Sequence, residues 1–327
     1  MSEQALPPAT PGVLETTRAV VEAARDVRID HQAIERLADA WVEHPLPDWD
    51  TAVHWNDGSW RTTNYVLLLD ALNFCFWPDE GEPKWGIHYG GKDLNGYRAL
   101  AAALRRAVEE GRPLYDAGYL AALELGELQQ IFRGRGSIPM PERRLENVRE
   151  VGRVLGERWD GRFSAAVEEA SGSAVALVGI LERDFPSFRD IAEYDGRPVR
   201  LLKRAQITAV DLVGTFGAEG WGRFHDADRL TAFADYKIPQ VLRARGVLAY
   251  SQRLADTVDR RTLIPAGEPR EVEIRAAMIW AVEWIRQSLA ARGAAHRAYE
   301  IDWMLWNQGQ RPLAGERPYH RTRTIFY

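Results

Sequence analysis

The segment Asn64–Phe74, NYVLLLDALNF, is too apolar to lie on the surface of a globular protein. A helix that is hydrophobic on all sides has to be covered by other elements. Around this segment, apolar residues recur at helical spacing along most of the chain. The sequence therefore predicts a mainly α-helical fold with a buried central helix, and further helices over residues 13–27, 33–42, 97–110, 120–132, 141–155 and most of 164–300.

One segment departs from the helical pattern. WGIHYGGKDLNGY, residues 85–97, alternates Trp85, Ile87 and Tyr89 and then contains the pair Gly90-Gly91. Alternation with a period of two followed by a glycine pair is typical of two short strands joined by a tight turn. A minor β-hairpin is expected between Trp85 and Leu94.

The composition restricts the class of protein. With 327 residues and 46% hydrophobic residues, the chain can form a substantial core. It contains no apolar run of the ~20 residues that cross a bilayer, and we expect no membrane partner. Residues 1–12, MSEQALPPATPG, lack the features of a signal peptide and are predicted to be a disordered lead, with 13–327 as one domain. A single cysteine, Cys75, excludes an intrachain disulfide and favours the cytoplasm.

Charge and motif content also exclude several functions. A formal net charge of −5 argues against a stable nucleic-acid partner, because backbone binding needs a basic surface. The seven histidines show no paired spacing, so we expect no protein-bound metal. Phosphate-binding, dinucleotide-binding and serine-hydrolase motifs are missing from the sequence, and no cofactor is expected.

The segment LTAFADYKIPQVL, residues 230–242, places charged residues within apolar sequence. We expect a short helix from an N-cap at Asp226 through Phe233. Pro239 suits the first turn of a second helix, which Gly246 closes. The bend between them would hold Asp235 near the N-terminus of the second helix, where a carboxylate is favoured.

Asp235 has two interpretations. It either caps the second helix, or it presents an ionised carboxylate to aromatic surface, where a reaction with a developing cation would need it. Its neighbours Tyr236 and Lys237 share the bend. The sequence leaves both interpretations open.

LLKRAQITAVDL, residues 201–212, contains one of only four lysines in the chain. Lys203 lies at the edge of a buried stripe. Its aliphatic stem either covers apolar surface, or its ammonium group faces an anion inside a cleft.

Two C-terminal segments complete the candidate residues. In IDWMLWNQGQ, residues 301–310, Asp302 lies near Trp303 and Trp306. An acid beside indole rings is suited to accepting hydrogen bonds from a guanine-like base while a ring stacks on it. In PYHRTRTIFY, residues 318–327, Arg321 and Arg323 either pair with core acids such as Glu271 and Glu273, or help to bind a phosphate.

Taken together, these segments resemble the queuosine salvage protein family, from about Val13 to Tyr327. The resemblance is carried, in order, by NFCFWPD, DFPSFRD, LLKRAQI, LTAFADYKIPQVL, GVLAYS, EVEIRAAMIWAVEWI, IDWMLW and PYHRTRTIFY. Members of the family are queuosine 5′-phosphate N-glycosylases/hydrolases. The resemblance implies a helical fold similar to helical DNA glycosylases. It also implies queuosine 5′-monophosphate as the small-molecule substrate and queuine, a 7-deazaguanine base, as the product.

The resemblance also implies roles for individual residues. Asp235 becomes the catalytic carboxylate, Phe233 lies beside it in the base pocket, and His54 in AVHWNDG is the pocket histidine. Asp302 hydrogen-bonds to the base. Trp303 and Asn307 stand where a relative has tyrosine and aspartate, so stacking is retained whereas one charge is lost. Lys203 is expected at the 5′-phosphate, and Tyr236, Lys237, Arg321 and Arg323 are expected at the phosphate or behind it.

Two other functions remain open at this stage. The first is a queuine- or nucleotide-binding protein without catalysis, which would use the same pocket. The second is a nucleic-acid base glycosylase of similar fold. That class needs a basic strand-binding face and usually a glycine-rich hairpin such as L-P-G-x-G, and the sequence has neither.

Overall fold

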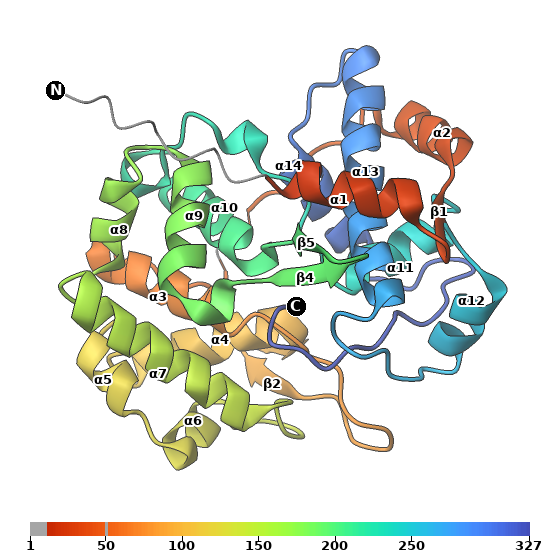
Figure 1. Ribbon diagram of the computed structural model, residues 1–327. Coiled ribbons are helices and arrows are strands. Elements are labelled where there is room, and N and C mark those ends of the chain that lie inside the picture. Colours follow the sequence, from red (N-terminus) through yellow and green to blue (C-terminus); the bar gives the residue numbers. More distant parts are fainter. Residues whose placement is uncertain (1–11, 50–51) are drawn as a thin grey trace, which may run out of the picture.

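A computed structural model describes residues 12–49 and 52–327; the predicted lead at 1–12 lies outside them except for Gly12. Helices dominate the chain (Figure 1), which confirms the predicted mainly α-helical class. No helix in these two ranges is long and apolar enough to cross a membrane. The helices are α1 Val13–Ala23, α2 His31–Trp41, α3 Trp60–Ala71, α4 Gly96–Glu109, α5 Ala117–Ala122, α6 Leu125–Ile131, α7 Pro141–Arg158, α8 Phe163–Glu169, α9 Ala174–Asp184, α10 Lys203–Phe216, α11 Lys237–Ala244, α12 Gln252–Asp259, α13 Pro269–Ala291 and α14 Ala298–Gln308.

Most of the apolar segment Asn64–Phe74 belongs to helix α3, and every residue from Thr62 to Ala71 is buried. Helices α4, α7, α8 and α10 pack around it. At its C-terminal end, where helix carbonyls have no partner within the helix, two buried arginines donate to the chain. Arg144 donates to the carbonyls of Phe74 and Cys75 at 2.6 and 3.0 Å, and Arg204 to those of Asp70 and Ala71. These bonds fix residues 73–77, which form one wall of the cavity described below.

Helix α13 is the second buried helix and extends over 23 residues. Helices α1, α2 and α14 pack on it, and Figure 1 shows α1 crossing it. Glu273, buried on α13, accepts hydrogen bonds from the backbone N–H groups of Asp26 and Val27 at 2.7 and 3.1 Å. The N-terminal elements are therefore tied to the same core as the rest of the chain.

Among the described residues, three antiparallel strand pairs accompany the helices. The predicted hairpin is confirmed as β2 Gly86–Tyr89 and β3 Lys92–Asn95. Gly90 and Gly91 have φ values of +57° and +74°, as the tightest hairpin turns require. A second hairpin, β4 Ile191–Tyr194 with β5 Arg197–Arg200, turns at Asp195-Gly196. The third pair joins β1 Val27–Ile29 to β6 Leu248–Tyr250.

The helix predicted from Asp226 to Phe233 is wrong. Only a 3₁₀ turn forms, at Ala227–Arg229, and residues 230–235 have no regular secondary structure. The Asp226 carboxylate accepts from Ser173 Oγ and Ala174 N instead, both at 2.6 Å, at the start of α9. The N–H of Phe233 is likewise bound by a side chain, that of Asp302. Tertiary hydrogen bonds thus replace the helical ones. The second helix, α11, begins at Lys237 with Pro239 in its first turn, as predicted.

Candidate active site

A cavity of about 730 Å³ opens between α4, α10, α14, residues 73–77 and the bend before α11. Its lining contains eight of the residues that the sequence singled out: His54, Lys203, Phe233, Asp235, Tyr236, Lys237, Asp302 and Trp303. These residues come from segments as much as 249 positions apart, so the fold alone brings them together. Asn307, Arg321 and Arg323 are not part of this lining.

Asp235 both caps a helix and faces the cavity. Its Oδ1 accepts from the N–H groups of Lys237 and Ile238, at 2.9 and 2.8 Å, at the start of α11. No hydrogen bond within the described residues uses Oδ2. Burial raises the pKa of this carboxyl, and the charge of Lys203 and the two amide hydrogen bonds oppose the rise. The capping interpretation is therefore confirmed for Oδ1, and Oδ2 stays available for the second interpretation.

Lys203 is the first residue of α10, and only 5% of it is exposed. Its Nζ donates to the carbonyl of Asn73 at 3.0 Å. Burial lowers the pKa of Lys203 to about 8, although the charges of Asp235, Asp70 and Asp302 favour its ammonium form. A phosphate dianion placed here would be repelled by those carboxylates. The structure thus places Lys203 near the charge of Asp235, and its expected contact with the 5′-phosphate stays a prediction.

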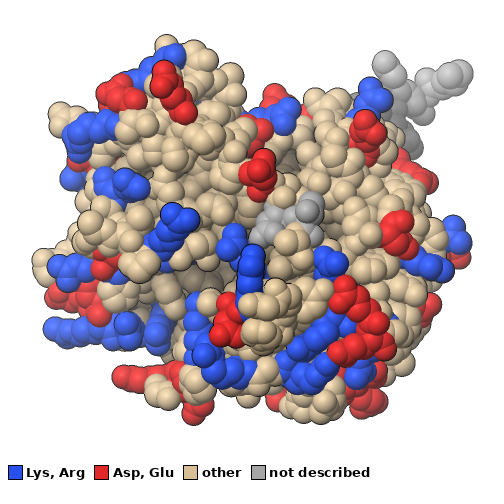
Figure 2. Space-filling model, turned by 180° about the vertical axis from the view of Figure 1, so that it is seen from behind, with Lys and Arg blue, Asp and Glu red and all other residues tan. Residues whose placement is uncertain are grey.

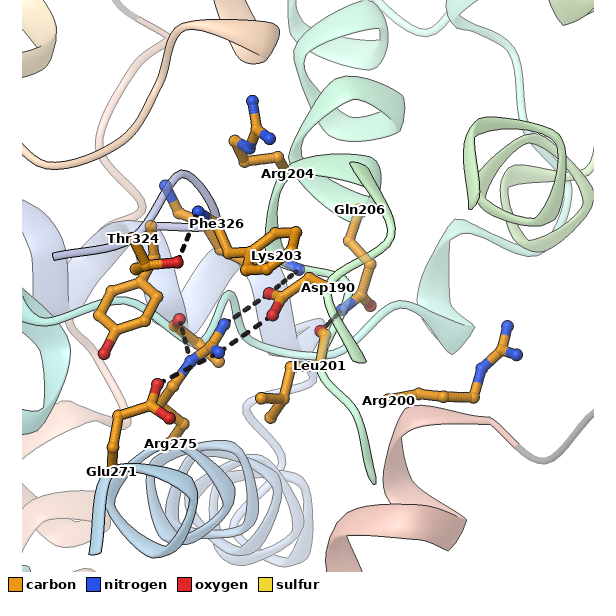
Figure 3. A network of polar contacts seen from close by, with 12 residues as sticks. Asp190, Arg200, Leu201, Lys203, Arg204, Gln206, Glu271, Arg275, Thr324 and Phe326 are labelled. Carbon is orange, nitrogen blue, oxygen red and sulfur yellow. Dashed lines mark hydrogen bonds and ion pairs between the residues drawn. The ribbon is translucent and has the colours of Figure 1, made fainter. Parts of the chain in front are cut away.

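Asp190 and Arg275 connect the segment of Lys203 to the segment of Asp235 (Figure 3). Arg275 donates to both carboxylate oxygens of Asp190, at 3.0 and 2.5 Å, and its Nε donates to the carbonyl of Ala234 at 3.0 Å, next to Asp235. Asp190 in turn accepts from the N–H of Lys203 at 3.3 Å. Neither residue was among the predicted site residues, although Asp190 ends DFPSFRD and Arg275 lies in EVEIRAAMIWAVEWI, two of the segments that carried the resemblance.

Asp302 lies deep in the cavity. Its Oδ1 accepts from the N–H of Phe233 at 2.9 Å, and no described residue bonds to its other oxygen. Burial raises its pKa, and so does the nearby charge of Asp235. A ligand that donates an N–H group to Asp302 would favour the ionised form. Asp302 thus shapes the backbone at Phe233 and leaves one acceptor for a bound molecule.

Aromatic rings form the wall next to Asp302. Trp303 stacks on Trp306 at 5.2 Å and an interplanar angle of 4°, and lies 5.7 Å from Trp49. The Nε1 of Trp303 is buried without a partner among the described residues. Phe74, Phe76 and Trp77 line the same cavity. A flat aromatic ligand fits such a space.

His54 lies in the cavity wall beside a residue that the sequence analysis missed. Its Nε2 is 2.9 Å from the hydroxyl of Tyr97, which donates to Asp211 Oδ2 at 3.1 Å. Tyr97 and Asp211 also line the cavity. Nothing in the local sequence distinguished them from ordinary core residues.

Arg321 and Arg323 contact residues around the cavity but are not part of its lining. Arg323 pairs with Asp79 at 2.5 Å and lies 3.9 Å from the ring of Trp77, and Arg321 lies over the same ring. Pairing of these arginines with Glu271 and Glu273 is wrong: Glu271 pairs with Arg275, and Glu273 binds the backbone amides described above.

Asn307, which is not part of the cavity lining, bonds within its own helix. Its Nδ2 donates to the carbonyl of Trp303, one turn earlier in α14, at 2.8 Å. A family member has a charged aspartate at this position. Its replacement by Asn307 therefore changes the charge outside the cavity lining.

Two lysines meet at one side of the cavity lining. Lys84 and Lys237 both belong to it. Partial desolvation lowers the pKa of Lys84, and the positive charge of Lys237 lowers it further. Lys237 also contacts Gln240 and Glu316, at 2.7 and 3.4 Å. The rarity of lysine in this chain was the only sequence signal for Lys84.

These features define a class of protein. A carboxylate beside a buried ammonium group, in a cavity walled by aromatic rings, belongs to a helical protein that can hold a flat base and stabilise positive charge on the group attached to it. No cluster of three or more potential metal ligands occurs within residues 12–49 and 52–327.

Comparison with known proteins identifies the family. The family model described as queuosine salvage protein matches residues 53–327. The chain belongs to this family, which confirms the resemblance inferred from its motifs.

Three relatives, each named queuosine 5′-phosphate N-glycosylase/hydrolase, illustrate the similarity. The Sphaerobacter thermophilus protein is 54% identical over 318 residues, covering 97% of this chain and 98% of its own. The Mus musculus protein is 35% identical, over 98% and 99% of the two chains. The Schizosaccharomyces pombe protein is 30% identical, over 96% and 99%.

Proposed function

We propose that this protein hydrolyses the N-glycosidic bond of queuosine 5′-monophosphate and releases queuine for salvage into tRNA. Family membership and the names of the relatives support this activity. The observation that carries it within the site is Asp235, which lines an aromatic cavity together with Lys203 and uses only Oδ1 in its hydrogen bonds to the described residues. We expect the enzyme in the cytoplasm, with no stable nucleic-acid partner.

Asp235 acts on the ribose. Cleavage of the bond between C1′ and the base leaves positive charge on the ribosyl ring, and a fixed carboxylate stabilises that charge. The two amide bonds to Oδ1 hold the carboxylate in place before the reaction. Lys203 keeps Asp235 ionised, because its charge opposes the rise in pKa that burial causes.

Asp302 and the aromatic rings hold the base. The free oxygen of Asp302 accepts from the guanine-like edge, while Phe233 and Trp303 contact the ring system. A 7-deazapurine has carbon at position 7, so the enzyme cannot activate it by protonation at N7. The proton for the departing base has to reach another nitrogen.

Lys84 and Lys237 bind the 5′-phosphate. Two neighbouring ammonium groups repel each other, and a phosphate between them would remove that repulsion. Tyr236 and Tyr319, whose rings are 4.9 Å apart, line the same part of the cavity. Arg321 and Arg323 then act behind the cavity wall, through Trp77.

Incubation with queuosine 5′-monophosphate, followed by chromatography of the products, tests the proposal. Free queuine and ribose 5-phosphate are expected in equal amounts. Tight binding of the nucleotide without release of queuine would instead identify a non-catalytic binding protein. Steeply salt-dependent binding of duplex DNA would favour the base-glycosylase alternative. On the face shown in Figure 2, basic and acidic side chains are interspersed, which argues against a strand-binding surface.

A further inference from the structure

Five aromatic side chains of the cavity lining form a closed circuit of ring contacts. The circuit consists of Trp49, His54, Tyr97, Trp306 and Trp303, all of which line the cavity and none of which is fully buried. In that order, neighbouring ring centroids are 6.1, 5.8, 6.2 and 5.2 Å apart, and 5.7 Å separates Trp303 from Trp49. Rings from the segment before α3, from α4 and from α14 therefore meet in one part of the cavity lining.

This aromatic circuit is suited to a small cation. The face of an aromatic ring attracts positive charge, and the indole ring of tryptophan attracts it most strongly. Three of the five rings are indoles. A cation beside the circuit can lie within the ~6 Å range of this attraction from several ring centroids at once. Cages of aromatic rings bind ammonium groups in this way.

The polar group behind Tyr97 favours a cation as well. The hydroxyl of Tyr97 donates to Asp211 Oδ2 at 3.1 Å. Burial raises the pKa of Asp211, and a cation bound on the other side of Tyr97 would favour its ionised form. A negative charge would then lie behind one ring of the circuit.

One ring of the circuit already contacts a cation of the protein. The guanidinium carbon of Arg98 lies 5.6 Å from the ring centroid of Trp306. Because like charges repel each other, a second cation is expected away from Trp306. The rings of Trp49, Tyr97 and Trp303 remain for it.

The position of Trp49 depends on a glycine of α10. A Cβ atom at Gly214 would lie 2.7 Å from Trp49 Cε3 and even closer to Cδ2 and Cε2, nearer than real Cβ atoms approach other atoms. The indole ring therefore packs directly on the backbone of the helix. No larger residue fits at this position unless Trp49 moves away from Trp303.

We propose that the aromatic circuit binds the ammonium group on the side chain of queuine, with Trp49 as a specificity-determining residue. The inference rests on the proposed N-glycosidase function. Queuine carries a substituted aminomethyl group at position 7, and an alkylamine of this kind is protonated at neutral pH. In the proposed function Asp235 serves the ribose and Asp302 the guanine-like edge, so the ammonium group needs another partner. The circuit supplies it and selects 7-aminomethyl bases over neutral 7-deazaguanines.

Calorimetric titration with two free bases of nearly equal size tests this subsite. 7-Aminomethyl-7-deazaguanine carries the cation, and 7-hydroxymethyl-7-deazaguanine is its neutral counterpart. The unmodified protein should bind the aminomethyl base about 5- to 30-fold more tightly, as expected for a desolvated cation–π contact. Equal affinities for the two bases, or no binding of either, would overturn the proposal.

Trp49→Leu assigns the preference to the ring. Leucine keeps an apolar side chain but has no π-face, so most of the preference for the aminomethyl base should disappear. The affinity for the hydroxymethyl base should change by less than about twofold, because a neutral group gains little from a ring face. An equal loss for both bases, or a preference that survives the substitution, would show that Trp49 does not read the charge.

Gly214→Ala supplies a second test in which all five rings are kept. It should displace Trp49 and reduce the preference for the aminomethyl base in the same way. Gly179→Ala, in α9, is the matched control, because nothing lies within 4 Å of a Cβ at that position. If Gly214→Ala binds both bases as Gly179→Ala does, the proposed role of Trp49 is wrong. An unmodified protein that prefers the aminomethyl base but releases no queuine from the nucleotide would contradict the proposed function instead.

Discussion

Asp190 and Arg275 form a buried bidentate ion pair that joins the segment of Lys203 to the segment of Asp235. Each side chain is 3% exposed. The pair reaches the backbone on both sides, at Ala234 O and Lys203 N. An error in its geometry would therefore move the candidate catalytic carboxylate and its neighbouring ammonium group relative to each other.

Arg275→Met should lower the free energy of unfolding by about 3–5 kcal/mol, because it leaves Asp190 buried without its partner. Urea denaturation followed by circular dichroism measures this. The double variant with Asp190→Asn removes both charges and should recover much of the loss. A double variant no more stable than Arg275→Met would show that packing of the guanidinium group, rather than its charge, is what matters.

Asp235→Asn should bind the nucleotide but lose turnover by several orders of magnitude. The amide keeps an oxygen for the two N–H groups of α11 and removes only the charge, so the melting temperature should change little. Asp235→Ala removes the cap as well and should cost about 0.5–2 kcal/mol of stability. Near-normal release of queuine by Asp235→Asn, measured in single turnovers, would leave capping as its only role.

Lys203→Met should shift the acidic limb of the pH–rate profile to higher pH. Burial already raises the pKa of Asp235, and the charge of Lys203 opposes that rise. Removing the charge raises the pKa further, so Asp235 becomes protonated, and inactive, at a higher pH than in the unmodified enzyme. The rate of queuine release should fall equally with the nucleotide and with the nucleoside. A loss confined to the monophosphate would restore Lys203 to the phosphate contact expected from the sequence.

Lys84→Ala and Lys237→Ala should each raise KM for queuosine 5′-monophosphate by about 10-fold to 100-fold, the usual effect of losing a hydrogen bond to a charged group. The KM for the nucleoside queuosine should stay the same, since it carries no phosphate. Steady-state kinetics on both substrates make the comparison. Equal effects on both would place the phosphate elsewhere in the cavity.

Asp302→Asn should reduce kcat/KM for queuine release by about 5- to 150-fold, corresponding to about 1–3 kcal/mol for a buried donor left without its acceptor. The Asn oxygen still accepts from the N–H of Phe233, so the fold should survive. Thermal unfolding provides the control. Unchanged kinetics would mean that Asp302 serves only to fix the backbone at Phe233.

Much of the fold followed from local patterns. Three predictions rested on a few neighbouring residues, and each was confirmed. They are the buried helix α3, the β2–β3 hairpin with its glycine pair, and the start of α11 near Pro239. The helix expected through Phe233 failed because the side chains of Asp226 and Asp302 bond to residues far away in the sequence. No local pattern records such contacts.

The sequence indicated which residues belong to the candidate site, but it did not show how they are arranged in space. Asp235, Asp302 and Lys203 were recognised, yet the carboxylates around Lys203 come from α3, α14 and the bend before α11. The Asp190–Arg275 pair spans 85 positions. Electrostatic surroundings depend on the packed structure, so the sequence could not show which carboxylates lie around Lys203.

The attachment of the N-terminal elements to α13 sets a limit on where the chain can be shortened. The family model begins at residue 53, but α1 and α2 cover α13, and β1 completes a strand pair with β6. A fragment that starts at Val53 would expose the apolar side of α13, leave the buried Glu273 without its backbone donors and remove Trp49 from beside Trp303. Such a fragment would aggregate when expressed, and the smallest practical unit for crystallisation or assay begins near Val13.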